Sequence, residues 1–136
     1  IIGFCEVAEN LDQAREIREN TNPSFLIYSG RDHQATDLIQ HGGNGVISIA
    51  ANIVPDKMRQ LVHFAFYNDF RKADTIAEEL SDLISLLQRQ PDPVTVKTIL
   101  SQMNLCEESF RLPICSFEDG EFRAQVQQTV HDLQLS

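Results

Sequence analysis

The side chains that could do chemistry in this 136-residue chain are three cysteines, four histidines and one serine in an apolar run. Cys5, Cys106 and Cys115 form no C-x-x-C pair and are odd in number, which argues against a disulfide framework or a zinc site and favours a reducing compartment such as the cytoplasm. The histidines lack metal-ligand spacing, and Ser48 lacks the flanking glycines of a nucleophile elbow. For Cys5 the alternatives are a small buried thiol that fills space in a strand, which the sequence favours, and a reactive or regulatory thiol.

A glycine cluster at residues 42–45 is the other feature that could bind a ligand. It lacks the order of strand, glycines and helix that a dinucleotide-binding loop requires, so we interpret it as a helix stop and a tight turn. The sequence therefore predicts no cofactor and no metal.

The charge balance excludes two kinds of partner. Eleven Lys and Arg against 20 Asp and Glu give a net charge of −9, and phosphate binding needs clustered cations, so no nucleic acid is expected. An acidic, solvated exterior explains the charge. No apolar run approaches the ~18 residues of a membrane span, so no membrane is expected either.

The elements that must position these residues alternate through residues 1–68. Apolar runs at 1–7, 25–28 and 46–50 are each followed by a helical pattern, and Asn10 is a candidate cap for the first helix. Runs that are apolar on both sides indicate strands buried on both faces, and their spacing leaves room for crossover helices. We predict three βα units with parallel strands.

Residues 69–136 form the predicted C-terminal helical region. An apolar stripe covers residues 73–87, Asp92 is a candidate cap, and Pro93 suits the first helical position. A three-stranded parallel sheet has two bare edges and needs cover on both faces. We therefore expect the chain to be a piece of something larger, and to form a homo-oligomer or to bind a partner chain that covers the open edges.

Five segments, in the same order along the chain, resemble the dihydrodipicolinate synthase and N-acetylneuraminate lyase family. They are residues 1–6 (IIGFCE), 25–32 (FLIYSGRD), 42–52 (GGNGVISIAAN), 90–97 (QPDPVTVK) and 110–113 (FRLP). The resemblance implies an α/β fold that is a partial (β/α)₈ TIM barrel, namely the three C-terminal βα units (strands 6–8) followed by a helical region. It also implies that about five N-terminal units are missing.

The resemblance implies a pyruvate-dependent lyase of lysine biosynthesis, whose reaction begins with a Schiff base on a barrel lysine. Cys5 stands at that lysine position. A thiolate can add to a carbonyl, but the hemithioacetal-type adduct contains no iminium to stabilise a carbanion. The thiol could be natural, or a lysine could have been replaced deliberately. The resemblance thus predicts a chain that is inactive alone, because both the amine and the N-terminal half are missing.

The resemblance also gives four substrate-binding candidates for a pyruvate-like small molecule. Gly30 lies at the end of the seventh strand, Arg31 stands where the family usually has Asp or Glu, and Ile47 borders the site through its backbone carbonyl. Asp92 replaces an asparagine. The alternatives are a solvated loop residue for Arg31 and a helix cap for Asp92. Besides a silent lyase, the chain could be one half of a split enzyme, or a pseudoenzyme that binds a metabolite or a protein.

Overall fold

The computed structural model describes residues 1–8 and 11–134. The chain divides into two compact units, Ile1–Ser81 and Asp82–Ser136, and each is described by itself. The domain boundary expected after residue 68 stays a prediction. The cap expected at Asn10 lies outside the described residues.

The first unit contains a parallel sheet in the order β1-β2-β3, built from β1 (Gly3–Glu6), β2 (Leu26–Ser29) and β3 (Gly45–Val46). Glu6 pairs with Ser29, and Ser29 with Val46. The three strands therefore end level with one another, and their carboxyl ends form one edge.

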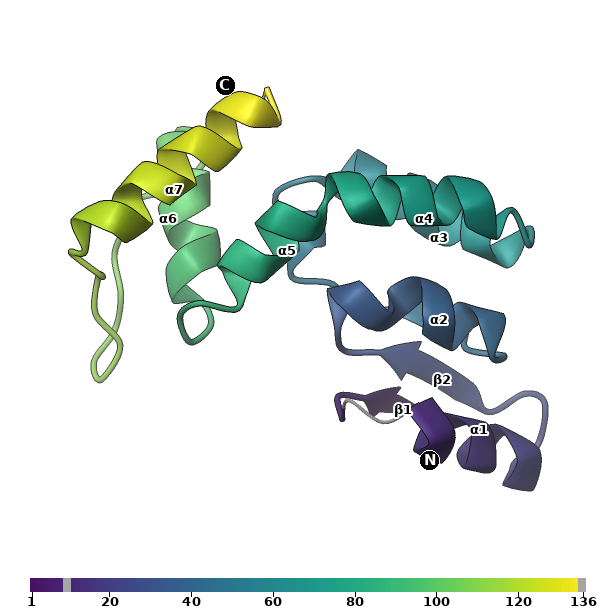
Figure 1. The fold of residues 1–136 in the computed structure, drawn as a ribbon. Coiled ribbons are helices and arrows are strands. Elements are labelled where there is room, and N and C mark those ends of the chain that lie inside the picture. Colours follow the sequence, from purple (N-terminus) through teal and green to yellow (C-terminus); the bar gives the residue numbers. More distant parts are fainter. Residues whose placement is uncertain (9–10, 135–136) are drawn as a thin grey trace. The chain divides into compact units, whose positions relative to one another are not determined.

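Four α-helices belong to the first unit: α1 (Leu11–Asn20), α2 (Ala35–Gln40), α3 (Pro55–Phe66) and α4 (Phe70–Glu79). Pro55 occupies the first turn of α3 as predicted, because proline lacks only an N–H that has no partner there. In Figure 1, α3 and α4 run side by side. Two short 3₁₀ turns, Asp32–Gln34 and Ala50–Asn52, precede α2 and α3.

Helices α1 and α2 cover one face of the sheet, and α3 and α4 pack against α2. Ala14 of α1, Ile27 of β2 and Leu38 of α2 form one buried cluster, and Phe4 of β1 packs against it. Because side chains alternate along a strand, Cys5 and its register partner Tyr28 face the other side. Neither is fully buried. The open face of the sheet thus carries the thiol.

The third strand is shorter than predicted. The sequence suggests a strand over residues 46–50, whereas β3 ends at Val46 and the chain turns into the 3₁₀ helix Ala50–Asn52. The carboxylate of Asp32 accepts hydrogen bonds from the backbone N–H groups of Ile49 (3.2 Å) and Ala50 (3.0 Å), which holds the turn. This contact spans 17 residues and overrides the apolar pattern.

The second unit consists of α5 (Ser81–Leu87, beginning at the division), α6 (Val94–Gln102) and α7 (Gly120–Asp132). The stripe at 73–87 is therefore divided between α4 and α5, with Leu80 at the C-cap of α4. The predictions for Asp92 as a cap and Pro93 as the first helical residue are wrong. Pro93 has φ −101° and ψ 27°, outside the helical region, so α6 begins at Val94 without a side-chain cap.

Candidate functional site

The carboxyl edge of the sheet brings together residues from all three strand ends, which is where parallel α/β sheets bind their ligands. Gly30, directly after β2, donates its N–H to the carbonyl of Glu6 (2.6 Å). Ile47, directly after β3, donates to the carbonyl of Ser29 (2.7 Å). The strand ladder therefore continues one residue past the strands and fixes the backbone at this edge.

Cys5 and Gly30 are immediate neighbours at this edge. A Cβ atom on Gly30 would lie 2.4 Å from Val7 Cγ1, 3.0 Å from Cys5 Sγ and 3.3 Å from the carbonyl oxygen of Glu6, closer than side-chain atoms normally approach. Glycine at position 30 therefore leaves space for the side chains of Val7 and Cys5. The thiol is unpaired and half-buried.

Arg31 connects the loops that follow β1 and β2. Its Nε donates to the carbonyl of Val7 (3.0 Å), and its side chain is otherwise exposed. The hydroxyl of Ser29 forms two hydrogen bonds with the backbone of Arg31. Ser29 Oγ donates to the Arg31 carbonyl (2.8 Å) and accepts from the Arg31 N–H (3.0 Å). The backbone of Arg31 is thus held on both sides by a buried serine.

Sequence reasoning missed Asp32 as a site residue. One of its oxygens holds the chain after β3, as described above, whereas Oδ1 is buried without a hydrogen-bond partner among the described residues. The S-G-R-D segment of the sequence contained this residue, but no local pattern signals a bond to residues 49 and 50.

The five candidate residues do not all belong to one unit. Cys5, Gly30, Arg31 and Ile47 lie at or next to the strand ends of the first unit. Asp92 belongs to the second unit, where it is exposed. Its role as a substrate-binding residue stays a prediction.

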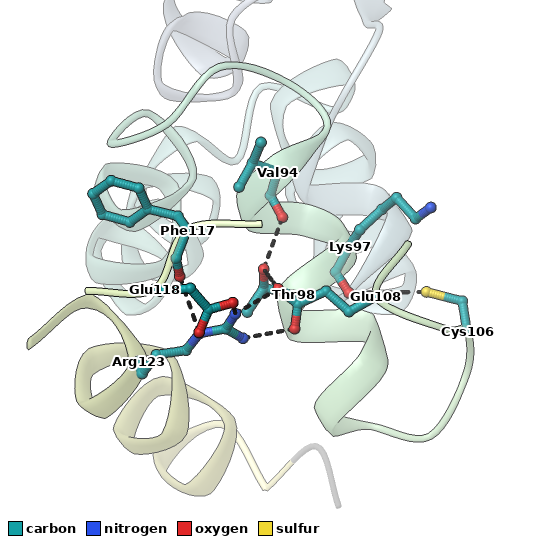
Figure 2. Close-up of polar contacts among 8 residues, drawn as sticks. All are labelled: Val94, Lys97, Thr98, Cys106, Glu108, Phe117, Glu118 and Arg123. Carbon is teal, nitrogen blue, oxygen red and sulfur yellow. Dashed lines mark hydrogen bonds and ion pairs between the residues drawn. The ribbon is translucent and has the colours of Figure 1, made fainter. Parts of the chain in front are cut away.

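The second unit contains a polar cluster of its own, centred on Arg123 of α7 (Figure 2). Its Nη1 and Nη2 donate to the two oxygens of Glu108, at 2.6 and 2.8 Å, and its Nε donates to the carbonyl of Phe117 (3.1 Å). The hydroxyl of Thr98, fully buried in α6, lies 3.0 Å from the same carboxylate. The cluster ties α6, α7 and the connection between them together.

Charge and hydrogen bonding shift both partners of this ion pair. The hydrogen bonds from Arg123 lower the pKa of Glu108, with a smaller contribution from Thr98, and partial burial opposes them. The hydrogen bonds to Glu108 raise the pKa of Arg123. Both groups are therefore held in their charged forms. No sequence pattern pointed to this pair.

Similarity to known proteins identifies the family of this chain. The model of the dihydrodipicolinate synthetase family matches residues 1–133. The chain belongs to the dihydrodipicolinate synthetase family. The sequence-based identification is therefore confirmed, and so is the fold of a partial TIM barrel followed by helices.

Relatives in this dihydrodipicolinate synthetase family are considerably longer than the chain. The 4-hydroxy-tetrahydrodipicolinate synthase of Alcanivorax borkumensis is 40% identical over 120 residues, which are 88% of this chain and 41% of the relative. The crystal structure of dihydrodipicolinate synthase from Aquifex aeolicus matches 99% of this chain and 46% of its own, with a TM-score of 0.96 and 31% identity. A chloride-inhibited Acinetobacter baumannii enzyme, solved with pyruvate, matches 100% and 46%, with a TM-score of 0.92 and 26% identity.

Each of the three lysine ammonium groups forms a polar contact with a neighbouring residue of this chain. Lys57 pairs with Glu79 (2.7 Å), and Lys72 pairs with Asp69 (2.6 Å). Lys97 donates to the carbonyl of Ser109 and lies over the ring of Phe110, 5.2 Å from its centroid. None of them lies on a strand. Across the described residues there is also no cluster of His, Cys, Asp and Glu that could hold a metal ion, and no helix long and apolar enough to cross a membrane.

Proposed function

We propose that this chain contributes the strand-end part of a keto-acid site of the dihydrodipicolinate synthetase type, and that it forms no Schiff base itself. The observation that carries the proposal is the thiol of Cys5 on the open face of the sheet beside Gly30, and we take position 5 to correspond to the lysine of the family motif. Schiff-base chemistry needs an amine, and a thiol cannot form the iminium. A pyruvate-like acid would bind by contacts alone.

The surroundings of the lysines support the same proposal. A Schiff-base amine must lie where it can reach an acid bound at the carboxyl ends of the strands. Lys57 lies on α3 and Lys72 on α4, and each contacts a carboxylate of its own neighbourhood. We therefore expect neither to replace the missing amine.

The test is reductive trapping of this chain with pyruvate and borohydride, read by intact-mass and peptide mass spectrometry. We expect no adduct on the wild type. The Cys5→Lys variant tests the position itself, with Cys106→Lys, an exposed thiol of the second unit, as the matched control. An adduct on Cys5→Lys alone supports the role given to position 5. Equal trapping of both variants would count against it.

We further propose that a partner chain, or a second copy, covers the open sheet. Large apolar side chains next to the sheet are exposed, with Ile2, just before β1, at 82% and Ile47, just after β3, at 60%. Apolar surface of this kind favours association. The chain spans about two fifths of the length of the curated relatives it matches. The chain would then be either one half of an assembled enzyme, or a pseudoenzyme.

The oligomeric state distinguishes this second proposal from a self-contained monomer. We expect light scattering to give a mass above that of one chain, 15.4 kDa, and Ile47→Lys to shift it toward one chain. Leu112→Lys, at a still more exposed apolar position in the second unit, is the control. A one-chain mass with a cooperative thermal transition would contradict the proposal.

The free thiols Cys5, Cys106 and Cys115 support a cytoplasmic location.

A further inference from the structure

Two arginines of this chain use their guanidinium groups differently. Arg123 donates from Nε to a backbone carbonyl and from both Nη atoms to the carboxylate of Glu108 (Figure 2). Arg31 also donates from Nε to a backbone carbonyl, that of Val7 (3.0 Å). Its two Nη atoms, however, have no hydrogen-bond or ion-pair partner among the described residues, and the side chain is exposed. Arg31 thus reproduces the Nε half of the Arg123 arrangement without a carboxylate partner in that part of the chain.

The open half of Arg31 has a defined chemistry. The two Nη atoms present donors in one plane, with a spacing that matches the two oxygens of a carboxylate. The bond from Nε to the Val7 carbonyl restricts the rotation of the guanidinium, so less side-chain entropy remains to be lost when an anion binds. A carboxylate is therefore the group that best completes this arginine.

The position of Arg31 supports a small ligand as the source of that carboxylate. Arg31 is the second residue after β2 and follows Gly30, at the edge where parallel strands bind ligands. Its own backbone is clamped by Ser29, and the next residue, Asp32, is bonded to the chain after β3. The guanidinium is consequently carried by a loop that is fixed on both sides.

We propose that Arg31 is a specificity-determining residue that receives the carboxylate of a small acid bound at the strand ends. The inference rests on the proposed function, because it assigns the class of ligand to the same site. It adds that the site selects an anion through two hydrogen bonds. The carboxylate of the acid would accept hydrogen bonds from the two Nη atoms of Arg31, as the carboxylate of Glu108 does from those of Arg123.

The test is a titration of the isotope-labelled chain with pyruvate and, separately, with its uncharged amide, followed by NMR at the Arg31 side chain and the Gly30 amide. We expect a saturable shift with pyruvate and at least about tenfold weaker binding of the amide. Arg31→Gln should weaken pyruvate binding by at least about tenfold and remove the preference over the amide. Arg31→Lys, which keeps the charge without the fork, should bind with intermediate affinity.

Arg59→Gln, an exposed arginine of α3, removes the same charge elsewhere and should bind pyruvate like the wild type. A role for Arg31 in loop structure alone would weaken both ligands equally and leave the preference unchanged, which would overturn the inference. An unsaturable shift, or one that chloride reproduces, would overturn it as well. The proposed function fails by a different signal, namely a borohydride-trapped adduct on a lysine, whether or not Arg31 selects an anion.

Discussion

The strand-end cluster around Arg31 and the helical cluster around Arg123 show two uses of one side chain. Arg123 is closed: every nitrogen has a partner, and its carboxylate comes from the same unit. Arg31 is open: one nitrogen is anchored and two face no acceptor among the described residues. The difference teaches that an arginine whose hydrogen bonds are complete holds the fold, whereas a partly bonded and anchored arginine is available to a ligand.

The largest expected effect comes from breaking the closed arginine. Arg123→Ala leaves the half-buried carboxylate of Glu108 without its two strongest donors, so we expect a loss of about 2–4 kcal/mol in the free energy of unfolding. Urea denaturation measures it. Arg89→Ala, which removes an exposed ion pair with Glu121 at 3.8 Å, should cost about 1 kcal/mol or less. Equal losses in the two variants would mean that Arg123 stabilises the fold no more than an exposed, ion-paired arginine does.

A smaller effect is expected beside the open arginine, at Asp32. Asp32→Ala removes the acceptor for the backbone N–H groups of Ile49 and Ala50, which should cost about 1–2 kcal/mol and speed hydrogen exchange at those two amides. Asp74→Ala, an exposed acidic residue of α4, is the control. Unchanged exchange at residues 49 and 50 would show that the loop is held by other contacts.

A third variant tests the packing between Gly30 and Cys5. Gly30→Ala brings its new Cβ to 2.4 Å from Val7 Cγ1 and 3.0 Å from the thiol, so we expect a loss of about 1–2 kcal/mol in the free energy of unfolding. Gly120→Ala, at the first position of α7 with nothing within 4 Å of its Cβ, should not destabilise the chain. A neutral Gly30→Ala would mean that the strand ends can spread.

The smallest effect is the pH dependence of the closed cluster. The hydrogen bonds that Arg123 donates lower the pKa of Glu108 in the folded state, so the unfolded state binds the proton more tightly. The stabilisation is therefore complete above the unfolded pKa, about 4.3, and is lost as the pH falls through the lower folded pKa. We expect the stability difference between wild type and Glu108→Gln to shrink below pH ~4. A difference that stays constant from neutral to acidic pH would contradict the lowered pKa.

The sequence predicted those elements whose signals are local. The run at 1–7 contains β1, the run at 25–28 covers β2 except for Ser29, and the parallel arrangement follows from crossover spacing. The run at 46–50 predicted too long a strand, because its end is decided by Asp32, 17 residues away in the chain. Asp92 looked like a cap, but the backbone of Pro93 delays α6 by one residue. The pattern of apolar residues does not reveal long-range hydrogen bonds or the backbone torsion angles of single residues.

The candidate site divides in the same way. The motifs identified Cys5, Gly30, Arg31 and Ile47, and the parallel register puts them at one edge. The bonds that fix this edge could not be predicted, because Arg31 reaches the Val7 carbonyl and Asp32 reaches residues 49 and 50 through folding alone. Glu108 and Arg123, 15 residues apart on either side of an irregular connection, had no recognisable spacing either.

Reductive trapping with pyruvate tests the central claim most directly, because it asks whether any amine of this chain forms a Schiff base. The thiol at position 5 and the engaged ammonium groups of Lys57, Lys72 and Lys97 predict that the intact mass stays unchanged after borohydride treatment. The same treatment of Cys5→Lys should add one reduced pyruvate at residue 5. A pyruvate adduct on a lysine of the wild-type chain would contradict the account.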